Sequence, residues 1–260
     1  MCLLVFALKA HPSYKLILAA NRDEFYERPT APAKFWDETP QLLAGKDLKA
    51  GGTWLGITKQ GKIAAITNYR DPSSIKKNAP SRGRIVSHYL AGNEEPDVYL
   101  KKLLKDADQY NGFNLILGNR DDLYWCSNRS GGYRRLSAGI YGLSNHLLDT
   151  PWPKISLSKD ALSRLISAGK NPSPETLFRL LADRSIPDDS RLPSTGVGIE
   201  WERILSPVFI VSSNYGTRSS TLLFIDRQDH VSFYERTFSP PDDHVSDSNH
   251  EFDIEPLNAL

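Results

Sequence analysis

Apolar runs of strand length alternate with polar turns over most of the chain. The two longest, residues 3–8 and 16–20, flank a short polar segment and predict a hairpin of two well-buried strands, the second of which begins at Lys15. Further strands are predicted at 53–58, 63–68, 113–117, 123–126, 140–143, 208–212, 219–225 and 231–234. Helices are predicted at 81–90, 95–107, 153–166 and 174–181, and a long loop at 185–202. Blocks of strands separated by helix pairs are typical of an α+β fold, with mostly antiparallel sheets covered by helices.

The register of the first hairpin decides what lies beside the start of the chain. If Lys9 pairs with Lys15, antiparallel pairing places Cys2 opposite Arg22. The start of the chain then lies next to the segment Asn21-Arg22-Asp23-Glu24. Successive residues of a regular strand point to opposite faces, so only one of Arg22 and Asp23 can line a pocket beside Cys2 unless the strand ends or bulges there.

Composition and charge exclude several classes of function. The chain has 260 residues, enough for one large domain or two small ones, and 40% of them are apolar, as in ordinary globular proteins. With 32 Lys and Arg against 31 Asp and Glu, no overall field favours nucleic acid. No apolar run approaches the ~20 residues of a membrane-spanning helix, so we expect no stable membrane insertion. No secretory signal is recognisable and there are only two cysteines, so we expect a cytoplasmic protein.

Cys2 is the candidate nucleophile. A cysteine at position 2 is small enough for methionine aminopeptidase to remove Met1, so the mature chain would carry a thiol and a free α-amine on one residue. An α-amine, with a pKa of ~7.7–8.0, can accept the proton of a thiol whose free pKa is ~8.5. The alternative is that Cys2 is only a small apolar residue at the start of a buried strand.

The segment Asn21-Arg22-Asp23-Glu24 supplies the charged groups that such a nucleophile needs. An acid can accept the hydrogen bonds of the amine, and an arginine favours the thiolate. The same residues could equally form an ordinary polar strand end. A near repeat, Asn119-Arg120-Asp121-Asp122, falls between two short predicted strands and predicts a hairpin turn there. Only the position opposite Cys2 distinguishes the first copy from the second.

Three further polar residues are candidates for a catalytic role. Asn68 and Asn145 each follow a short apolar strand, where a side-chain amide can donate to an oxyanion, although Asn is also a common turn residue. Arg218 lies among small polar residues and could bind an anion or polarise the thiol, although most such arginines are surface charges. The histidines lack metal-ligand spacing and no dinucleotide or phosphate-loop motif occurs, so we expect neither a metal nor a cofactor.

Nine segments, in order along the chain, resemble the NRDE family, also called the transport and Golgi organisation protein 2 family. They are Met1-Cys2-Leu3, Asn21-Arg22-Asp23-Glu24, Gly51-Gly52-Thr53-Trp54-Leu55-Gly56, Thr67-Asn68-Tyr69-Arg70, Ser81-Arg82-Gly83, Phe113-Asn114-Leu115, Gly142-Leu143-Ser144-Asn145, Pro151-Trp152-Pro153-Lys154 and Tyr215-Gly216-Thr217-Arg218. The matches cover nearly the whole chain. We therefore expect a single domain over residues 1–238, followed by a polar and peripheral tail over 239–260.

The resemblance implies a four-layer αββα sandwich of the N-terminal-nucleophile (Ntn) hydrolase type, similar to the choloylglycine-hydrolase-type amidases. The roles that it implies are nucleophile for Cys2, amine anchor for Asp23, oxyanion donors for Asn68 and Asn145, and support of the thiol for Arg218.

One position departs from those amidases, which carry an arginine three residues before the aspartate, where this chain has Ala20. Arg22 is adjacent to the aspartate instead. Because side chains alternate between the two faces of a strand, we expect Arg22 to face elsewhere than the amidase arginine does. The candidates for contact with the substrate are Arg22, Tyr69, Arg70 and His146.

Two functions of different kinds follow. The leading hypothesis is a cysteine Ntn amidohydrolase that acts on a non-peptide amide or related acyl bond. The alternative, implied by the processes with which the family has been connected, is a non-catalytic protein that binds or transfers an acyl-CoA, a lipid or haem, with a part in lipid homeostasis or Golgi organisation. A purely structural or interaction protein is a third hypothesis. For the first two, the expected partner is a small molecule and not a nucleic acid.

Overall fold

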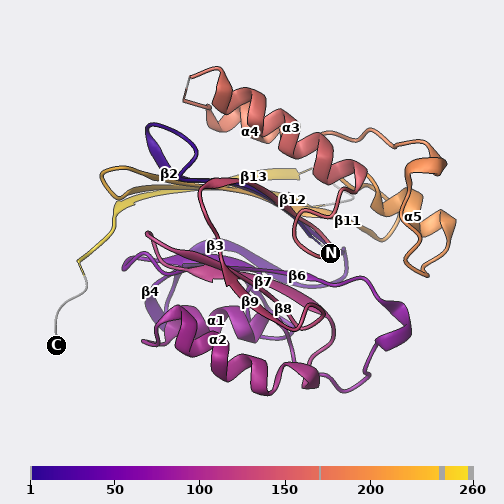
Figure 1. The fold of residues 1–260 in the computed structure, drawn as a ribbon, viewed down its shortest axis with the longest axis horizontal. Helices are drawn as coiled ribbons and strands as arrows, with labels where there is room; N and C mark the ends of the chain where they lie inside the picture. Colours follow the sequence, from indigo (N-terminus) through magenta and orange to yellow (C-terminus); the bar gives the residue numbers. More distant parts are fainter. Residues whose placement is uncertain (1, 170, 240–243, 257–260) are drawn as a thin grey trace.

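Two antiparallel sheets lie face to face, and helices cover the outer face of each (Figure 1). The computed structural model describes residues 2–169, 171–239 and 244–256. One helix layer comprises α3 (Pro153–Ser167) and α4 (Pro174–Leu181), and the other comprises α1 (Gly83–Ala91) and α2 (Pro96–Lys105). This arrangement confirms the predicted four-layer αββα sandwich. No helix in the described part of the chain is long and apolar enough to span a membrane.

The first sheet has the strand order β10-β1-β2-β11-β12-β13. Its strands are β1 (Cys2–Leu8), β2 (Tyr14–Phe25), β10 (Gly139–Leu143), β11 (Tyr215–Asp226), β12 (His230–Ser239) and β13 (His244–Asp253). Both β1 and β2 lie inside the sheet, between the second sheet and the helices α3 and α4. Because both of their faces are covered, their sequences are continuous apolar runs rather than alternating ones.

The second sheet is a meander in which the strands follow one another in sequence order. Its strands are β3 (Thr30–Trp36), β4 (Thr39–Asp47), β5 (Leu55–Thr58), β6 (Ile63–Asn68), β7 (Phe113–Gly118), β8 (Leu123–Ser127) and β9 (Gly132–Arg135). Helix α1 packs on the outer face of this sheet, over β4, β5 and β6.

Alternate residues of the first hairpin face different layers. Even-numbered residues such as Leu4 and Leu18 belong to the core between the two sheets. Odd-numbered residues such as Val5 and Ile17 pack against α3 and α4. Cys2 belongs to the even-numbered set and therefore faces the second sheet.

The predicted register of the first hairpin is confirmed. The backbone N–H of Lys9 donates to the carbonyl of Lys15 at 2.7 Å. From that turn the pairing continues without a shift to Cys2 opposite Arg22. Beyond this pair β2 continues to Phe25 and pairs only with β11. Among the described residues, the last residues of β2 are thus held in the sheet by β11.

Two segments before β11 differ from the sequence predictions. Residues 208–212 were predicted as a strand, but they form only a single bridge, between Val211 and Gly216. Their polar backbone groups bond elsewhere, for example the N–H of Phe209 to the carbonyl of Asp183 at 2.8 Å. The predicted loop 185–202 contains a short 3-10 helix and the start of α5 (Ile199–Leu205).

The segment predicted as a polar tail adds a strand to the fold. Residues 244–253 form β13, which pairs with β12 at the edge of the first sheet. Ile254 after it is buried between the sheets, and Ser248 donates to the carbonyl of Ala33 at 2.7 Å. The polar sequence of β13 suits an edge strand, where apolar side chains would promote pairing with other molecules. The remaining tail positions, 240–243 and 257–260, lie outside the described residues.

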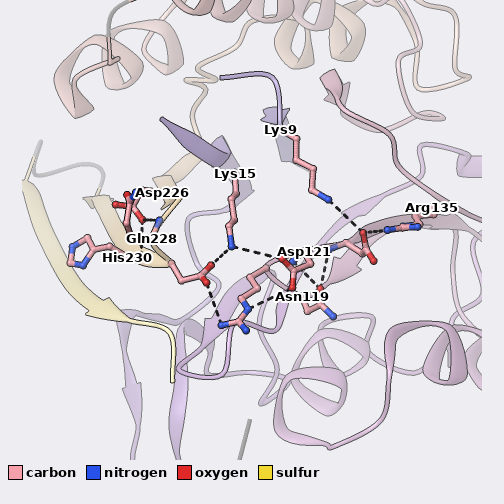
Figure 2. A network of polar contacts seen from close by, with 11 residues as sticks. Lys9, Lys15, Asn119, Asp121, Arg135, Asp226, Gln228 and His230 are labelled. Atoms are coloured by element: carbon pink, nitrogen blue, oxygen red, sulfur yellow. Dashed lines mark hydrogen bonds and ion pairs between the residues drawn. The ribbon is translucent and has the colours of Figure 1, made fainter. Parts of the chain in front are cut away.

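Turns from both sheets meet at the end of the sandwich opposite Cys2 (Figure 2). Lys15, at the start of β2, contacts Asp229 at 2.5 Å and Asp121 at 3.8 Å. Asn119 accepts the backbone N–H groups of Asp121 and Asp122, each at 2.9 Å. The second copy of the motif is therefore a hairpin turn between β7 and β8, as predicted, and its acids hold the two sheets together at this end.

Candidate functional site

A cavity of about 510 Å³ opens where β1 begins. Strand ends from both sheets line it, together with the segment that leads into α1. Among the site residues predicted from the sequence, those that line the cavity are Cys2, Arg22, Asp23 and Asn68. The hairpin and the neighbouring sheet thus bring the thiol, an acid, a guanidinium and a side-chain amide to one place.

Cys2 and Arg22 are cross-strand partners, and both line the cavity. Burial raises the pKa of the Cys2 thiol, and the charge of Asp23 raises it further. The guanidinium of Arg22 and a hydrogen bond from the backbone of Asp23 act in the opposite direction and lower that pKa. Arg22 is therefore the cation placed to stabilise a thiolate.

The structure corrects the expectation that Arg22 faces away from the amidase position. Ala20 lies two residues before Arg22, so both residues share one face of β2, and that face is the face of Cys2. The guanidinium is thus displaced along the strand from the amidase position but not turned away from it. Both Arg22 and Asp23 line the cavity, near the end of β2 and beside a shift in its register with β11.

The side chain of Arg22 is nearly enclosed. It is 6% exposed, and its guanidinium lies over the ring of Trp54, 4.1 Å from the ring centre. Burial lowers the pKa of Arg22, whereas the nearby Cys2 and Glu24 raise it. Among the described residues, its Nη1 finds no hydrogen-bond partner.

Asp23 lies on the opposite face of β2 from Arg22 and is held by hydroxyl groups. Thr217 Oγ1 donates to Oδ1 of Asp23 at 2.7 Å, and the Tyr215 hydroxyl donates to its backbone carbonyl at 3.0 Å. Burial raises the pKa of the Asp23 carboxyl, while the charge of Lys154 and the hydrogen bond from Thr217 lower it. The acid is thus fixed in position beside a buried cation.

Lys154 is that buried cation, and it was not predicted from the sequence as a site residue. It is 3% exposed, and its Nζ donates only a long hydrogen bond, 3.4 Å, to the carbonyl of Pro207 within the described residues. Burial lowers the pKa of Lys154 to about 8, and the negative charge of Asp23 opposes this shift. A lysine in the first turn of α3 also opposes the helix dipole, so its position there needs a partner such as Asp23.

Arg218 is the extra residue of a bulge in β11. Thr217 pairs with Asp23 and Ser219 pairs with Arg22, so Arg218 has no partner in the ladder. Its Nη1 donates to the carbonyls of Phe25, Tyr26 and Arg28 at 3.0–3.1 Å. Arg218 does not line the cavity; it holds the chain that follows β2.

Asn145 lies directly behind Asn68. Its Nδ2 donates to the backbone carbonyl of Asn68 at 2.9 Å, and its own carbonyl accepts the N–H of Arg70 at 2.7 Å. The neighbouring Ser144 donates through Oγ to the carbonyl of Cys2 at 3.0 Å. This turn therefore links the end of β6 to the start of β1, and it sets the position of Asn68 relative to the thiol.

Tyr69, Arg70 and His146 also lie behind the cavity rather than in it. Arg70 forms a buried ion pair with Glu202 at 2.6 Å, and its guanidinium lies 4.8 Å from the ring centre of Trp152. The rings of Tyr69 and His146 are 4.9 Å apart. Burial lowers the pKa of His146. Of the four predicted substrate contacts, only Arg22 faces the cavity.

Sequence reasoning missed several residues that build the site, although each lies in one of the nine family segments. They are Trp54, Arg82, Lys154, Tyr215 and Thr217. The segments marked the right regions of the chain, but no spacing rule indicated which side chain in each segment would meet Cys2 or Asp23. In the described part of the chain, no group of three or more His, Cys, Asp or Glu side chains could hold a metal ion.

The sequence model of the family described as Transport and Golgi organisation 2 matches residues 1–240. The chain belongs to this family. The transport and Golgi organization protein 2 homolog of Bos taurus is 37% identical over 279 residues, which cover 98% of this chain and 100% of that relative. The resemblance drawn from the nine segments is thereby confirmed.

Two solved structures show the same fold. A mutant conjugated bile acid hydrolase from Clostridium perfringens has a TM-score of 0.52 at 8% identity, covering 98% of this chain and 97% of that one. An N-acylethanolamine-hydrolyzing acid amidase ortholog from Caenorhabditis elegans has a TM-score of 0.51 at 12% identity, covering 85% and 92%. These similarities confirm the Ntn-hydrolase fold. At such low sequence identities they are evidence of the fold and not of the activity.

Proposed function

We propose that this chain is a cysteine N-terminal-nucleophile amidohydrolase, acting on a non-peptide amide or related acyl bond after removal of Met1. The observation that carries the proposal is the position of the Cys2 thiol at the head of β1, in a cavity that Arg22 and Asp23 also line. Met1 itself lies outside the described residues. The names of the two structural neighbours, a conjugated bile acid hydrolase and an N-acylethanolamine-hydrolyzing acid amidase, support hydrolysis of this kind.

In the first step, the Cys2 sulfur attacks the carbonyl carbon while the thiol proton passes to the α-amine of the same residue. The carbonyl π electrons move to oxygen and form an oxyanion. Asp23 holds the resulting ammonium group, and Thr217 and Tyr215 keep Asp23 in place. Arg22 lowers the pKa of the thiol and so favours the attacking thiolate.

The side-chain amide of Asn68 donates to the oxyanion from the end of β6. One such donor stabilises the transition state by about 2.7–4 kcal/mol in known enzymes. Asn145 supports this donor from behind, because its Nδ2 holds the backbone carbonyl of Asn68.

Collapse of the tetrahedral intermediate breaks the carbon–nitrogen bond. The leaving nitrogen takes the proton from the α-ammonium group and departs as an amine, which leaves a thioester on Cys2. A water molecule, deprotonated by the α-amine, then attacks the thioester carbon. The carbon–sulfur bond breaks, a carboxylic acid leaves, and the thiol and amine return to their starting states.

Covalent labelling tests this proposal within one molecule, because the chain has a second cysteine. Cys126 is buried in the core under α1 and α2, and burial raises its pKa to about 12. A thiol-directed acyl electrophile should therefore form an adduct on Cys2, which peptide mass spectrometry locates. Preferential labelling of Cys126, or none at Cys2, would overturn the proposal. So would an intact mass that retains Met1 in protein from the native host.

A non-catalytic binding or transfer protein for an acyl-CoA, a lipid or haem is the second candidate. Two observations favour it. The Cys2 thiol is buried and its pKa is raised, so less of it is ionised. Arg218 donates to three backbone carbonyls and does not support the thiol. This candidate predicts that Cys2→Ala keeps ligand binding. Retained binding together with no turnover of an amide library would decide for it and against the hydrolase.

A further inference from the structure

The cavity beside Cys2 carries an excess of positive charge. Its lining includes five cationic side chains against three carboxylates, an excess of two, while the whole chain has a net charge of only +1. Arg28 is already bound by Asp47 at 2.7 Å and approached by Glu24 at 3.7 Å. The excess therefore falls on the other cations, Arg22, Lys49, Lys77 and Arg82.

The N-terminus of helix α1 opens on the same cavity, through Ser81, Arg82 and Gly83. Among the described residues, no acceptor is bonded to the backbone N–H groups of Arg82 and Gly83, no side chain caps the helix, and its first turn contains no acid. Free N–H groups at a helix start, together with the helix dipole, attract anions.

Close packing holds this helix start in place. A Cβ on Gly52 would lie 2.4 Å from the backbone carbonyl carbon of Gly83, so only glycine permits the contact. The N–H of Thr53 donates to the carbonyl of Gly83 at 3.2 Å. The loop before β5 therefore fixes the direction in which the free N–H groups point.

Arg22 gives a second, independent indication of a ligand. It is 6% exposed and lines the cavity, and its Nη1 has no hydrogen-bond partner among the described residues. A buried guanidinium without its full set of acceptors is costly, and such groups are normally satisfied by a ligand or a carboxylate. Arg82 also faces the cavity and donates from Nη1 to the carbonyl of Gly112 at 2.8 Å, which holds that side chain in position.

We propose that the first N–H groups of α1, with Arg22 and Arg82, form a subsite for the carboxylate or phosphate group of the ligand. The ligand class that follows is an anionic acyl conjugate, with its charged group at α1 and its acyl carbon at Cys2. The placement of the acyl carbon rests on the proposed function, whereas the anion subsite does not require the thiol.

Binding of small anions tests the subsite directly. Inorganic phosphate and acetate are titrated into the full chain and into Cys2→Ala, with the melting temperature and the amide shifts of Arg82 and Gly83 as readouts. Both proteins should bind saturably with equal affinity. Arg22→Met and Arg82→Met should each weaken binding about tenfold or more, because each removes a charge-assisted hydrogen bond. Arg120→Met, which removes the arginine of the other motif copy, should leave binding unchanged.

Two outcomes would overturn the subsite. One is that the wild type shows no saturable binding of either anion. The other is that Arg120→Met loses as much affinity as Arg22→Met and Arg82→Met. If Arg22→Met fails to fold, the half-buried Arg82 still tests the subsite, since Arg82→Met alone must weaken binding.

Octyl phosphate distinguishes a conjugate from a free anion. It should bind more tightly than phosphate and depend on the same arginines, and equal affinity would overturn the conjugate as the ligand class. The two proposals can fail separately, because Cys2→Ala is expected to bind anions. If Cys2 is not labelled by the electrophile but anions still bind, the hydrolase proposal is wrong and the subsite proposal is not affected.

Discussion

The two copies of the Asn-Arg-Asp motif have nearly the same sequence and opposite environments. In the first copy, residues 21–23 are buried inside β2, the arginine stacks on Trp54, and the acid is held by hydroxyl groups. In the second copy, residues 119–121 form a partly exposed turn, where Arg120 contacts Asp121 at 3.6 Å and Asp229 at 3.4 Å.

The difference shows how the same groups serve structure at one end and chemistry at the other. At the exposed end, charges find opposite charges, and each contact stabilises the fold only slightly. At the buried end, loss of hydration lowers the pKa of Arg22 and of Lys154, although the charge of Asp23 opposes the shift of Lys154. A fold that keeps such costly groups beside a thiol and a cavity has the features of a functional site.

The largest contrast is expected between the two aspartates. Asp23→Asn should slow acylation of Cys2 by about 100-fold or more, because the group that holds the proton-accepting amine loses its charge. Asp121→Asn should leave the rate unchanged. Stopped-flow acylation with the electrophile of the labelling test measures both, and similar rates for the two variants would remove the functional distinction between the copies.

Lys154, at the buried end, provides the next test, through stability as a function of pH. The pKa of Lys154 is lowered from 10.5 to about 8 on folding, so between these values the unfolded chain binds more protons than the folded one. The free energy of unfolding of the wild type should therefore rise from pH 8 to 10.5 relative to that of Lys154→Met, by about 3 kcal/mol. Urea denaturation at several pH values measures this difference. A flat difference between the wild type and Lys154→Met would contradict the buried charge of Lys154.

A smaller effect is expected at the arginines. Arg22 lowers the pKa of Cys2, so Arg22→Met should move the pH profile of Cys2 alkylation upward. At neutral pH the reaction would then be slower, because less of the thiol is ionised. Alkylation by iodoacetamide, followed from pH 6 to 10, gives the profile, with Arg120→Met as the matched control. An unshifted profile would show that the guanidinium does not act on the thiol.

The smallest effect is expected for the stability of the exposed end. Asp121→Asn removes contacts with Lys15 and Arg120, and should lower the free energy of unfolding by less than about 1 kcal/mol. High salt should abolish most of that difference, because it screens exposed charges. Urea denaturation at low and high salt measures it. A larger, salt-independent loss would mean that this turn is as sensitive as the buried copy.

The local pattern of apolar residues was sufficient to predict the strands and the register of the first hairpin. Its continuous apolar runs could be buried on both faces only inside a covered sheet, and a short turn left one simple register. The pattern failed where strands are irregular. In β3, Pro32 and shifts in register interrupt the alternation, so the sequence showed no strand there. Val208, Phe209 and Ile210 are apolar because they pack in the core, although their backbone groups do not form the ladder of a strand.

The sequence alone placed Cys2 beside Arg22 and Asp23, because pairing across one short hairpin depends on neighbouring residues only. The rest of the site required the assembled molecule. Thr217 reaches Asp23 through a bulge in a strand almost two hundred residues away, and Lys154 reaches it from a helix of another layer. Contacts of such long range depend on how sheets and helices pack, and no periodicity or local spacing records them. This packing is also what made one copy of the motif a buried site and the other an exposed turn.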